Sequence, residues 1–273
     1  MRNAAGRGMI PIPRKELNLV LFVALGTESA IPTVHHNVFS HFLDWDCIVY
    51  VHKNETYVSP DGQKFKEIMS KCSIVRMPGM YWEHFLMTLA PELVQQYEHV
   101  AVLLDDLFAP SQGDTPVNVT KLLQQMREHN VSSISPSVKG SAWSTTNPYD
   151  DRCLWHVEQI ETFFQIFSRE MFQCWHSYMH FSNRQGWCLD LCLDKQMCPL
   201  ISNLAVDASM IAYHIGYQLD LESFIPESAL AGTNLTGSTF RGGTGGSLVL
   251  CDSLGGCPNY FPNTNIIACH ATD

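Results

Sequence analysis

The sequence has few charged side chains, and basic residues are the scarcer sign. Of its 273 residues, 16% are Asp, Glu, Lys or Arg, with 17 basic against 27 acidic residues and a formal net charge of −10. A chain so short of positive charge lacks the basic surface that nucleic acids and anionic membranes require. We therefore expect no nucleic-acid partner, and an anionic substrate would need a metal ion to offset the repulsion.

Sequence signatures of several other protein classes are also missing. There is no Gly-x-Gly-x-x-Gly motif and no internal repeat, which argues against a dinucleotide-binding fold and against a solenoid. The only early apolar run, Leu17–Leu25, is too short to span a bilayer, so we expect no transmembrane segment in this chain. The 45% hydrophobic content is nevertheless typical of a compact folded domain.

Cysteines and glycosylation sequons, by contrast, are numerous. The chain has ten cysteines, and four Asn-x-Ser/Thr sequons begin at Asn54, Asn118, Asn130 and Asn234. Together they favour the secretory pathway or Golgi lumen, where cysteines pair and asparagines are glycosylated. No signal or anchor is seen in residues 1–15, which leaves two alternatives: a luminal domain whose anchor lies elsewhere, or a cytoplasmic protein with free thiols.

The first half of the chain alternates between strand and helix patterns. Apolar runs predict strands at Leu17–Leu25, Cys47–Val51, Ser73–Met77, Val100–Leu104 and Val131–Ser135, the last ending at Pro136. Spacings of three and four predict helices at Ala30–Leu43, Gln63–Met69, Tyr81–Tyr97 with a break at Pro91, and Val117–Asn130. This alternation is typical of an α/β fold with a Rossmann-like, mostly parallel central sheet flanked by helices.

The second half is less regular. Residues 139–151 are rich in Ser, Thr, Asn and Pro and predict a long active-site loop, whereas Val157–Phe167 is strand-like and Ser168 is a candidate helix cap. Glycines crowd together after residue 230. We therefore predict one domain over residues 16–230 and an irregular, poorly ordered Gly/Cys-rich tail over residues 231–273.

The strand Val100–Leu104 ends in two adjacent carboxylates, Asp105 and Asp106. Open α/β sheets bind their ligands at the carboxyl ends of the strands. The pair is therefore a candidate site for a hard divalent cation, Mn²⁺ or Mg²⁺, that carries a phosphorylated substrate. The alternative is an ordinary turn, in which Asp is favoured because it hydrogen-bonds its own backbone.

Other polar residues follow predicted strands or stand late in the chain. Gly26, Thr27 and His52 follow the first two strands, and from that position alone we expect them to border a nucleotide. Asp190, in the segment Gly-Trp-Cys-Leu-Asp, is a candidate base that would take a proton from an acceptor hydroxyl. The adjacent His35 and His36 begin a predicted helix and are expected to be solvated.

The stretch from Tyr81 to Leu107 contains the two adjacent acids, and several further blocks follow it in order: Ile134–Ser137, Val157-Glu158, Phe167–Arg169, Cys174-Trp175, Gly186–Asp190, and Val206-Asp207 with His214. In this order the blocks resemble a family of unknown function that is labelled lysine-ketoglutarate reductase trans-splicing-related. Its members are similar to GT-A glycosyltransferases, and the stretch from Tyr81 to Leu107 resembles the part of the family that ends in an acidic D-x-D-type motif.

The resemblance implies a metal-dependent transferase that moves a sugar from a nucleotide-sugar donor to an acceptor. By position, Asp105 and Asp106 would hold the metal or the ribose, and His214 would complete the metal shell. Asp190 would be the base. Trp187, Glu158 and Asp207 would contact the acceptor or support these residues.

Two departures from the family pattern keep other readings open. Leu104 stands where a three-residue motif would place its first acid, and Cys188 replaces a glycine-like position. The alternative function is therefore a catalytically degenerate binding or scaffold protein. A third is a phosphatase-like hydrolase built on the same two acids. Leu107 and Phe108 follow the acids, however, and do not continue the D-x-D-x-T/V motif that such a hydrolase would have.

Overall fold

The structure is a computed structural model. It describes residues 17–52, 62–78, 80, 82–140, 153–157, 160–179, 198–201, 203–215, 228 and 265–269. Its strands are β1 (Asn18–Leu25), β2 (Asp46–Val51), β3 (Ser73–Arg76), β4 (His99–Leu104), β5 (Leu107–Phe108), β6 (Ser133–Lys139), β7 (Cys153–Val157), β8 (Phe164–Ser168), β9 (Leu204–His214) and β10 (Asn265–Cys269). Its helices are η1 (Glu28–Ala30), α1 (Ile31–His41), α2 (Gly62–Lys71), α3 (Trp82–Met87), α4 (Pro91–Val94), α5 (Val119–Glu128) and α6 (Arg169–Ser177).

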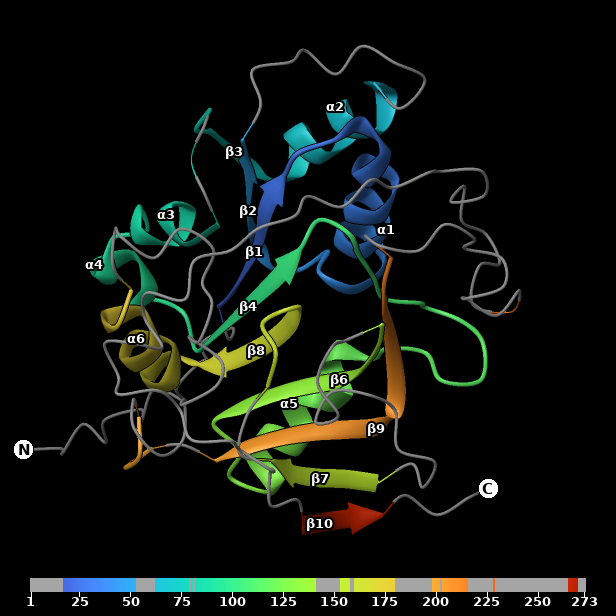
Figure 1. Cartoon of the computed structure of the whole chain (residues 1–273), viewed down its shortest axis with the longest axis vertical. Helices are drawn as coiled ribbons and strands as arrows, with labels where there is room; N and C mark the ends of the chain where they lie inside the picture. Colours follow the sequence, from blue (N-terminus) through green and yellow to red (C-terminus); the bar gives the residue numbers. More distant parts are fainter. Residues whose placement is uncertain are drawn as a thin grey trace, which may run out of the picture.

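All described strands belong to one sheet, in the order β10-β7-β9-β6-β8-β4-β1-β2-β3 with β5 attached to β9 (Figure 1). β1 pairs in parallel with β2 and β4, β2 with β3, and β6 with β9. Because β8 is antiparallel to both β4 and β6, these two strands share one direction, and only β5, β7 and β8 run the other way. The prediction of an α/β fold with a mostly parallel central sheet is confirmed.

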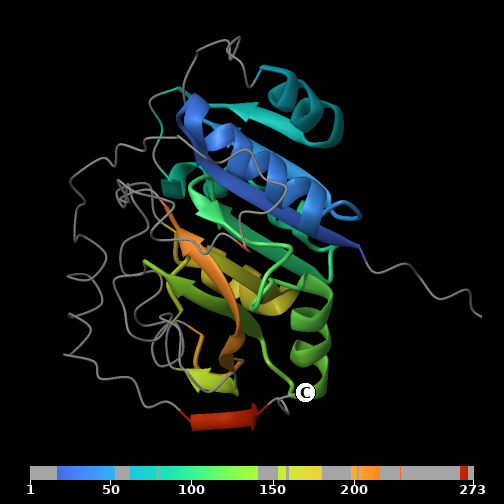
Figure 2. The same cartoon turned by 90° about the vertical axis from the view of Figure 1, so that its right-hand side faces the viewer.

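Helices cover both faces of the sheet and create two apolar cores. Alternate residues of β1 enter different cores, as the two-residue period of a strand requires: Val20 and Phe22 join one core, and Leu19 and Leu21 the other. The first core is completed by α1, α2 and α5, and the second by α3, α4 and α6. Figure 1 shows the second group of helices together on the left, and Figure 2 gives the view turned by 90°.

Several predicted element boundaries hold. The expected break at Pro91 divides the predicted helix into α3 and α4, with Pro91 as the first residue of α4. Ser168 caps α6, since its hydroxyl accepts a hydrogen bond from the Met171 N–H at 3.3 Å.

The prediction that a strand stops at Pro136 is wrong. β6 continues to Lys139, and Pro136 lies opposite Asp207 where the register between β6 and β9 shifts. The pairing of β6 with β8 involves Ser133 and Ile134, before the proline. A proline is tolerated there because the ladder is already interrupted and needs no N–H donor.

The single strand predicted over Val157–Phe167 is also wrong, because two strands divide this region. β7 ends at Val157 and β8 begins at Phe164. Ile160, in the connection, is fully buried, and Phe163 packs against the core. The apolar pattern therefore continues through a turn, and hydrophobicity alone does not reveal the interruption.

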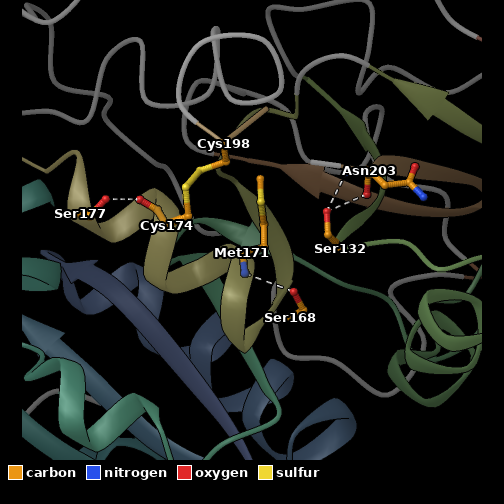
Figure 3. Close-up of a disulfide and its surroundings, with 7 residues drawn as sticks. All are labelled: Ser132, Ser168, Met171, Cys174, Ser177, Cys198 and Asn203. Carbon is orange, nitrogen blue, oxygen red and sulfur yellow. Dashed lines mark hydrogen bonds between the residues drawn. A yellow bond between two sulfur atoms is a disulfide. The ribbon is translucent and has the colours of Figure 1, made fainter. Parts of the chain in front are cut away.

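Two disulfides join cysteines that are 25 and 24 residues apart in the sequence. Cys47 at the start of β2 is bonded to Cys72 beyond α2, and Cys174 of α6 to Cys198 (Figure 3). Cys153 is disulfide-bonded as well. These bonds are consistent with an oxidising compartment. Among the described helices, none has the length and apolar character to cross a membrane.

The predicted boundary at residue 230 stays a prediction. Residues 229–264 and 270–273 lie outside the described part of the chain. Within the predicted tail, β10 is described and pairs antiparallel with β7 at the edge of the sheet.

Candidate functional site

The two acids follow β4 directly and form a turn that leads into β5. We call Asp105 and Asp106 the acid turn. β4 lies beside β1, whose last residue is Leu25, and the register pairs Val23 with Leu104. This register brings the residue after β1 next to the acid turn: the Gly26 N–H donates a hydrogen bond to Asp105 Oδ2 at 3.1 Å.

The next strand end adds an imidazole to the same edge. His52 follows β2, and its backbone N–H donates to the Leu25 carbonyl at 3.3 Å. Its ring lies so close to the Gly26 Cα that a Cβ atom at this position would overlap the ring. A larger residue at position 26 would therefore force the His52 ring to move. Thr27 is exposed, and its hydroxyl shares a 2.9 Å hydrogen bond with that of Ser29.

Asp106 faces the opposite way, toward the end of β9. The pairing of β5 with β9 sets Leu107 opposite His214, and the Ile215 N–H donates to the Asp106 carbonyl at 3.0 Å. This arrangement brings His214 Nε2 within 3.2 Å of Asp106 Oδ2. The ring of Phe163 stacks on that of His214, with centroids 4.3 Å apart.

The pKa values of Asp105 and His214 are both raised in the folded protein. Burial of its carboxyl, assisted by the charge of Asp106, raises the pKa of Asp105 well above its usual value, against the effect of the Gly26 hydrogen bond. Burial alone would lower the pKa of His214, but the hydrogen bond and charge of Asp106 raise it overall, with a contribution from a hydrogen bond to the Gly140 backbone. A divalent cation would displace these protons, because metal ligands bind in their deprotonated forms.

The acid turn offers suitable ligand atoms for Mn²⁺ or Mg²⁺. Asp106 Oδ1 is buried and has no hydrogen-bond partner, which is costly for a carboxylate oxygen unless something else binds it. Carboxylate oxygens suit both cations, and an imidazole nitrogen beside them is accepted by Mn²⁺. Within the described residues no three His, Cys, Asp or Glu side chains are grouped as a ready metal site.

Helix α1 holds the segment that follows the acid turn. The buried Asn37 donates from Nδ2 to the Leu107 carbonyl at 2.6 Å and accepts from the Ala109 N–H at 3.1 Å. The Nε2 atoms of His36 and His41 both hydrogen-bond the Ala109 carbonyl, at 3.0 and 2.7 Å. Because a carbonyl can only accept, both rings donate Nε2–H.

The expectation that His35 and His36 are solvated is wrong for both rings. His35 Nε2 lies 2.7 Å from Glu67 Oε2 of α2. Burial and the neighbouring His41 lower the pKa of His36 to about 4, and burial also lowers the pKa of His41. Sequence reasoning missed this support because no local pattern shows that residues 107–109 pack on this helix.

Asp207 lies away from the acid turn along β9. It is fully buried, and its Oδ1 accepts hydrogen bonds from the backbone N–H and the hydroxyl of Ser209, at 2.8 and 2.6 Å. These bonds stabilise the irregular part of β9 where its register with β6 shifts. The other predicted site residues, Asp190, Trp187 and Glu158, lie outside the described residues.

Comparison with known proteins identifies the fold. No protein-family model and no curated protein matches the chain. Among solved structures, it is similar to the mannosyltransferase PcManGT from Pyrobaculum calidifontis in complex with GDP-Man and Mn²⁺, with a TM-score of 0.51 at 10% identity over 81% of this chain and 62% of that one. This likeness shows a GT-A-like fold.

Two further solved structures match with lower scores. They are S. aureus TarS, with a TM-score of 0.48 at 9% identity over 73% of this chain and 36% of that one, and GalNAc-T7 with UDP, GalNAc and Mn²⁺, with a TM-score of 0.47 at 10% identity over 73% and 43%. The chain thus spans between about a third and three fifths of the length of these three structures.

Proposed function

We propose that this chain is a glycosyltransferase domain that moves a sugar from a nucleotide-diphosphate donor to an acceptor with the help of Mn²⁺ or Mg²⁺. One observation carries the proposal: at the carboxyl edge of a GT-A-like sheet, Asp106 has a buried Oδ1 without a partner, and its Oδ2 lies 3.2 Å from His214 Nε2. That edge is where open α/β sheets place their ligands. The Mn²⁺ and GDP-Man bound by the similar mannosyltransferase support the choice of ligand class.

Asp106 and His214 would supply the protein ligands, and Asp105 would join them once ionised. When bound, the cation would offset the negative charge that builds on the leaving diphosphate. The Gly140 backbone and the Phe163 ring keep the His214 imidazole oriented toward Asp106. Such orientation of a ligating histidine by its other contacts is typical of metal sites.

Gly26, Thr27 and His52 would border the nucleotide. The missing side chain at Gly26 lets the His52 ring pack directly over the end of β1. The exposed Thr27 hydroxyl lies one residue farther along the same edge and is available to a donor. Acceptor binding would fall to Trp187 and Glu158, and the role of base to Asp190. Asp207 is fully buried and bonded to Ser209, so it would support neighbouring residues rather than contact the acceptor.

A catalytically degenerate binding or scaffold protein is the second candidate. It is favoured by the absence, among the described residues, of three grouped metal-ligating side chains. Leu104, in the position of the first acid of a three-residue motif, points the same way. Such a protein would bind nucleotide or glycan without turnover.

We also propose, from the same resemblance, that residues 16–230 form the transferase domain and that the protein belongs to the family of unknown function named above. A secretory or Golgi location accords with the disulfides.

Release of nucleoside diphosphate from a panel of nucleotide sugars tests the activity. With Mn²⁺ present, wild type should release UDP or GDP from at least one donor, and Asp106→Asn should lose at least tenfold in rate. Glu92→Gln makes the same charge change at an exposed position of α4 and should match wild type. Absence of release from every donor, in a folded protein that still binds nucleotide, would favour the binding protein.

A further inference from the structure

Two of the glycosylation sequons lie at the two ends of α5. Asn118-Val-Thr120 stands at its start, and Asn130-Val-Ser132 follows its end. Both asparagines are exposed, whereas the inner face of the helix is buried in the core. The fold therefore leaves both side chains where a bulky group could project into solvent.

Asn118 is the N-cap of α5, and its cap contact is compatible with a glycan. Its Oδ1 accepts the Lys121 N–H at 3.0 Å. A glycan is attached to the other side-chain atom, Nδ2, so the cap would survive the modification. Thr120, the hydroxyl residue of this sequon, is exposed as well.

Asn130 adopts a left-handed backbone with φ 53°, which directs the chain away from the helix. Its carbonyl accepts a hydrogen bond from Asn203 Nδ2 at 2.7 Å, so the fold holds its backbone in place. The hydroxyl of Ser132 donates to the Asn203 carbonyl at 3.0 Å and accepts its N–H at 2.8 Å (Figure 3). Since the fold engages this sequon hydroxyl, Asn130 must be modified before β6 and β9 come together.

The two positions lie at opposite edges of the sheet. α5 leads from the edge of the acid turn to the start of β6, and the Val117 N–H donates to the Pro110 carbonyl at 2.8 Å. Asn118 is therefore on the edge that carries the candidate site. Asn130 precedes β6, which runs in the direction of β4, so it lies on the far edge.

We propose that Asn118 and Asn130 are both N-glycan attachment sites, independently of any transferase activity. The co-reactant is an oligosaccharide linked through a diphosphate to a lipid. A bond forms between Asn Nδ2 and the anomeric carbon of the first sugar, the bond from that carbon to the diphosphate oxygen breaks, and the amide loses one proton as the lipid diphosphate leaves. Disulfide formation requires the same oxidising compartment in which sequons are modified.

The test is secretion of the full chain, with a secretion signal added, from eukaryotic cells. Enzymatic removal of N-glycans in heavy-oxygen water, followed by peptide mass spectrometry, marks each glycosylated Asn as a labelled Asp. The proposal expects label at Asn118 and at Asn130. A secreted, disulfide-bonded protein that lacks label at either position would overturn the proposal for that position.

Matched variants separate modification from folding. Thr120→Ala keeps the Asn118 cap and should abolish label at Asn118, whereas Thr120→Ser should retain it. Asn130→Gly preserves the left-handed backbone and should remove one glycan with secretion unchanged. Ser132→Thr keeps the sequon and should keep the label at Asn130. Label at Asn118 in Thr120→Ala would show that the sequon does not direct it.

Discussion

The two carboxylates of the acid turn are neighbours in sequence but have different surroundings. Asp105 accepts an N–H from Gly26, beneath the ring of His52, and burial raises its pKa. Asp106 faces His214 and keeps one buried oxygen without a partner. The difference indicates that Asp105 is engaged by the residue that follows β1, while Asp106 has an oxygen left for a ligand.

The largest expected effect comes from Asn37, which holds the segment that follows both acids. Asn37→Leu would leave the Leu107 carbonyl and the Ala109 N–H without their partner in a buried setting. At about 1–3 kcal/mol for each unsatisfied group, we expect the free energy of unfolding to fall by about 4 kcal/mol. Denaturant titration measures it. The exposed Lys66→Ala on α2 is the control, and a loss below about 0.5 kcal/mol for Asn37→Leu would contradict the role of α1.

Low pH should also weaken the contact between α1 and the segment that follows the acid turn, because His36 is neutral in that contact. The pKa of His36 falls from 6.5 to about 4 in the folded protein, so its neutral form is favoured there. Stability is then complete above pH 6.5 and declines as the pH falls toward 4, by about 3 kcal/mol at 1.36 kcal/mol per pKa unit. Denaturant titrations across this window measure the slope. His36→Gln should flatten it, and an unchanged slope would exclude His36 as its source.

Gly26→Ala tests how tightly the Asp105 side is packed. The new Cβ would overlap the His52 ring, and we expect a loss of about 2 kcal/mol in the free energy of unfolding. His52→Ala should remove the obstacle, so the glycine substitution should cost far less in that background. A double-mutant cycle measures the coupling. Additive effects would show that the ring does not constrain position 26.

Replacing each of the two acids by asparagine should change the free energy of unfolding in opposite directions. Without metal at pH 7, Asp105→Asn should raise the free energy of unfolding by about 1 kcal/mol, since it removes the cost of ionising a buried carboxyl. That gain should vanish as the pH falls toward 4, because a raised pKa leaves Asp105 neutral there. Asp106→Asn should lower stability by about 1 kcal/mol through weaker pairing with His214. Denaturant titrations in a chelator measure both, and equal signs would contradict the comparison.

Much of the difference between the surroundings of Asp105 and Asp106 could not be predicted from the sequence. The run Val100–Leu104 and the acids after it predict a strand that delivers charge to a sheet edge, and parallel pairing with β1 places Gly26 there as expected. The contact of Asp106 with His214 depends on the antiparallel pairing of β5 with β9, two strands that no local pattern links. Resemblance to a known family, rather than periodicity, suggested that these residues belong together.

The later strands show the same limit. Pro136 argues locally against a strand, yet a shift of register in β6 and β9 accommodates it. Likewise, no periodicity reveals that His36 and His41 turn toward the Ala109 carbonyl, because that contact joins segments about 70 residues apart. Local sequence patterns predict the helices and strands, whereas the candidate site depends on contacts between segments that are distant in the sequence.

Calorimetric titration of Mn²⁺, with UDP or GDP present, into wild type and Asp106→Asn tests the central claim most directly. If Asp106 and His214 hold a cation on a nucleotide diphosphate, wild type should bind Mn²⁺, and Asp106→Asn should bind it at least tenfold more weakly. Glu92→Gln should be unchanged. Equal Mn²⁺ affinity in wild type and Asp106→Asn, or no Mn²⁺ binding by either folded protein, would contradict the account.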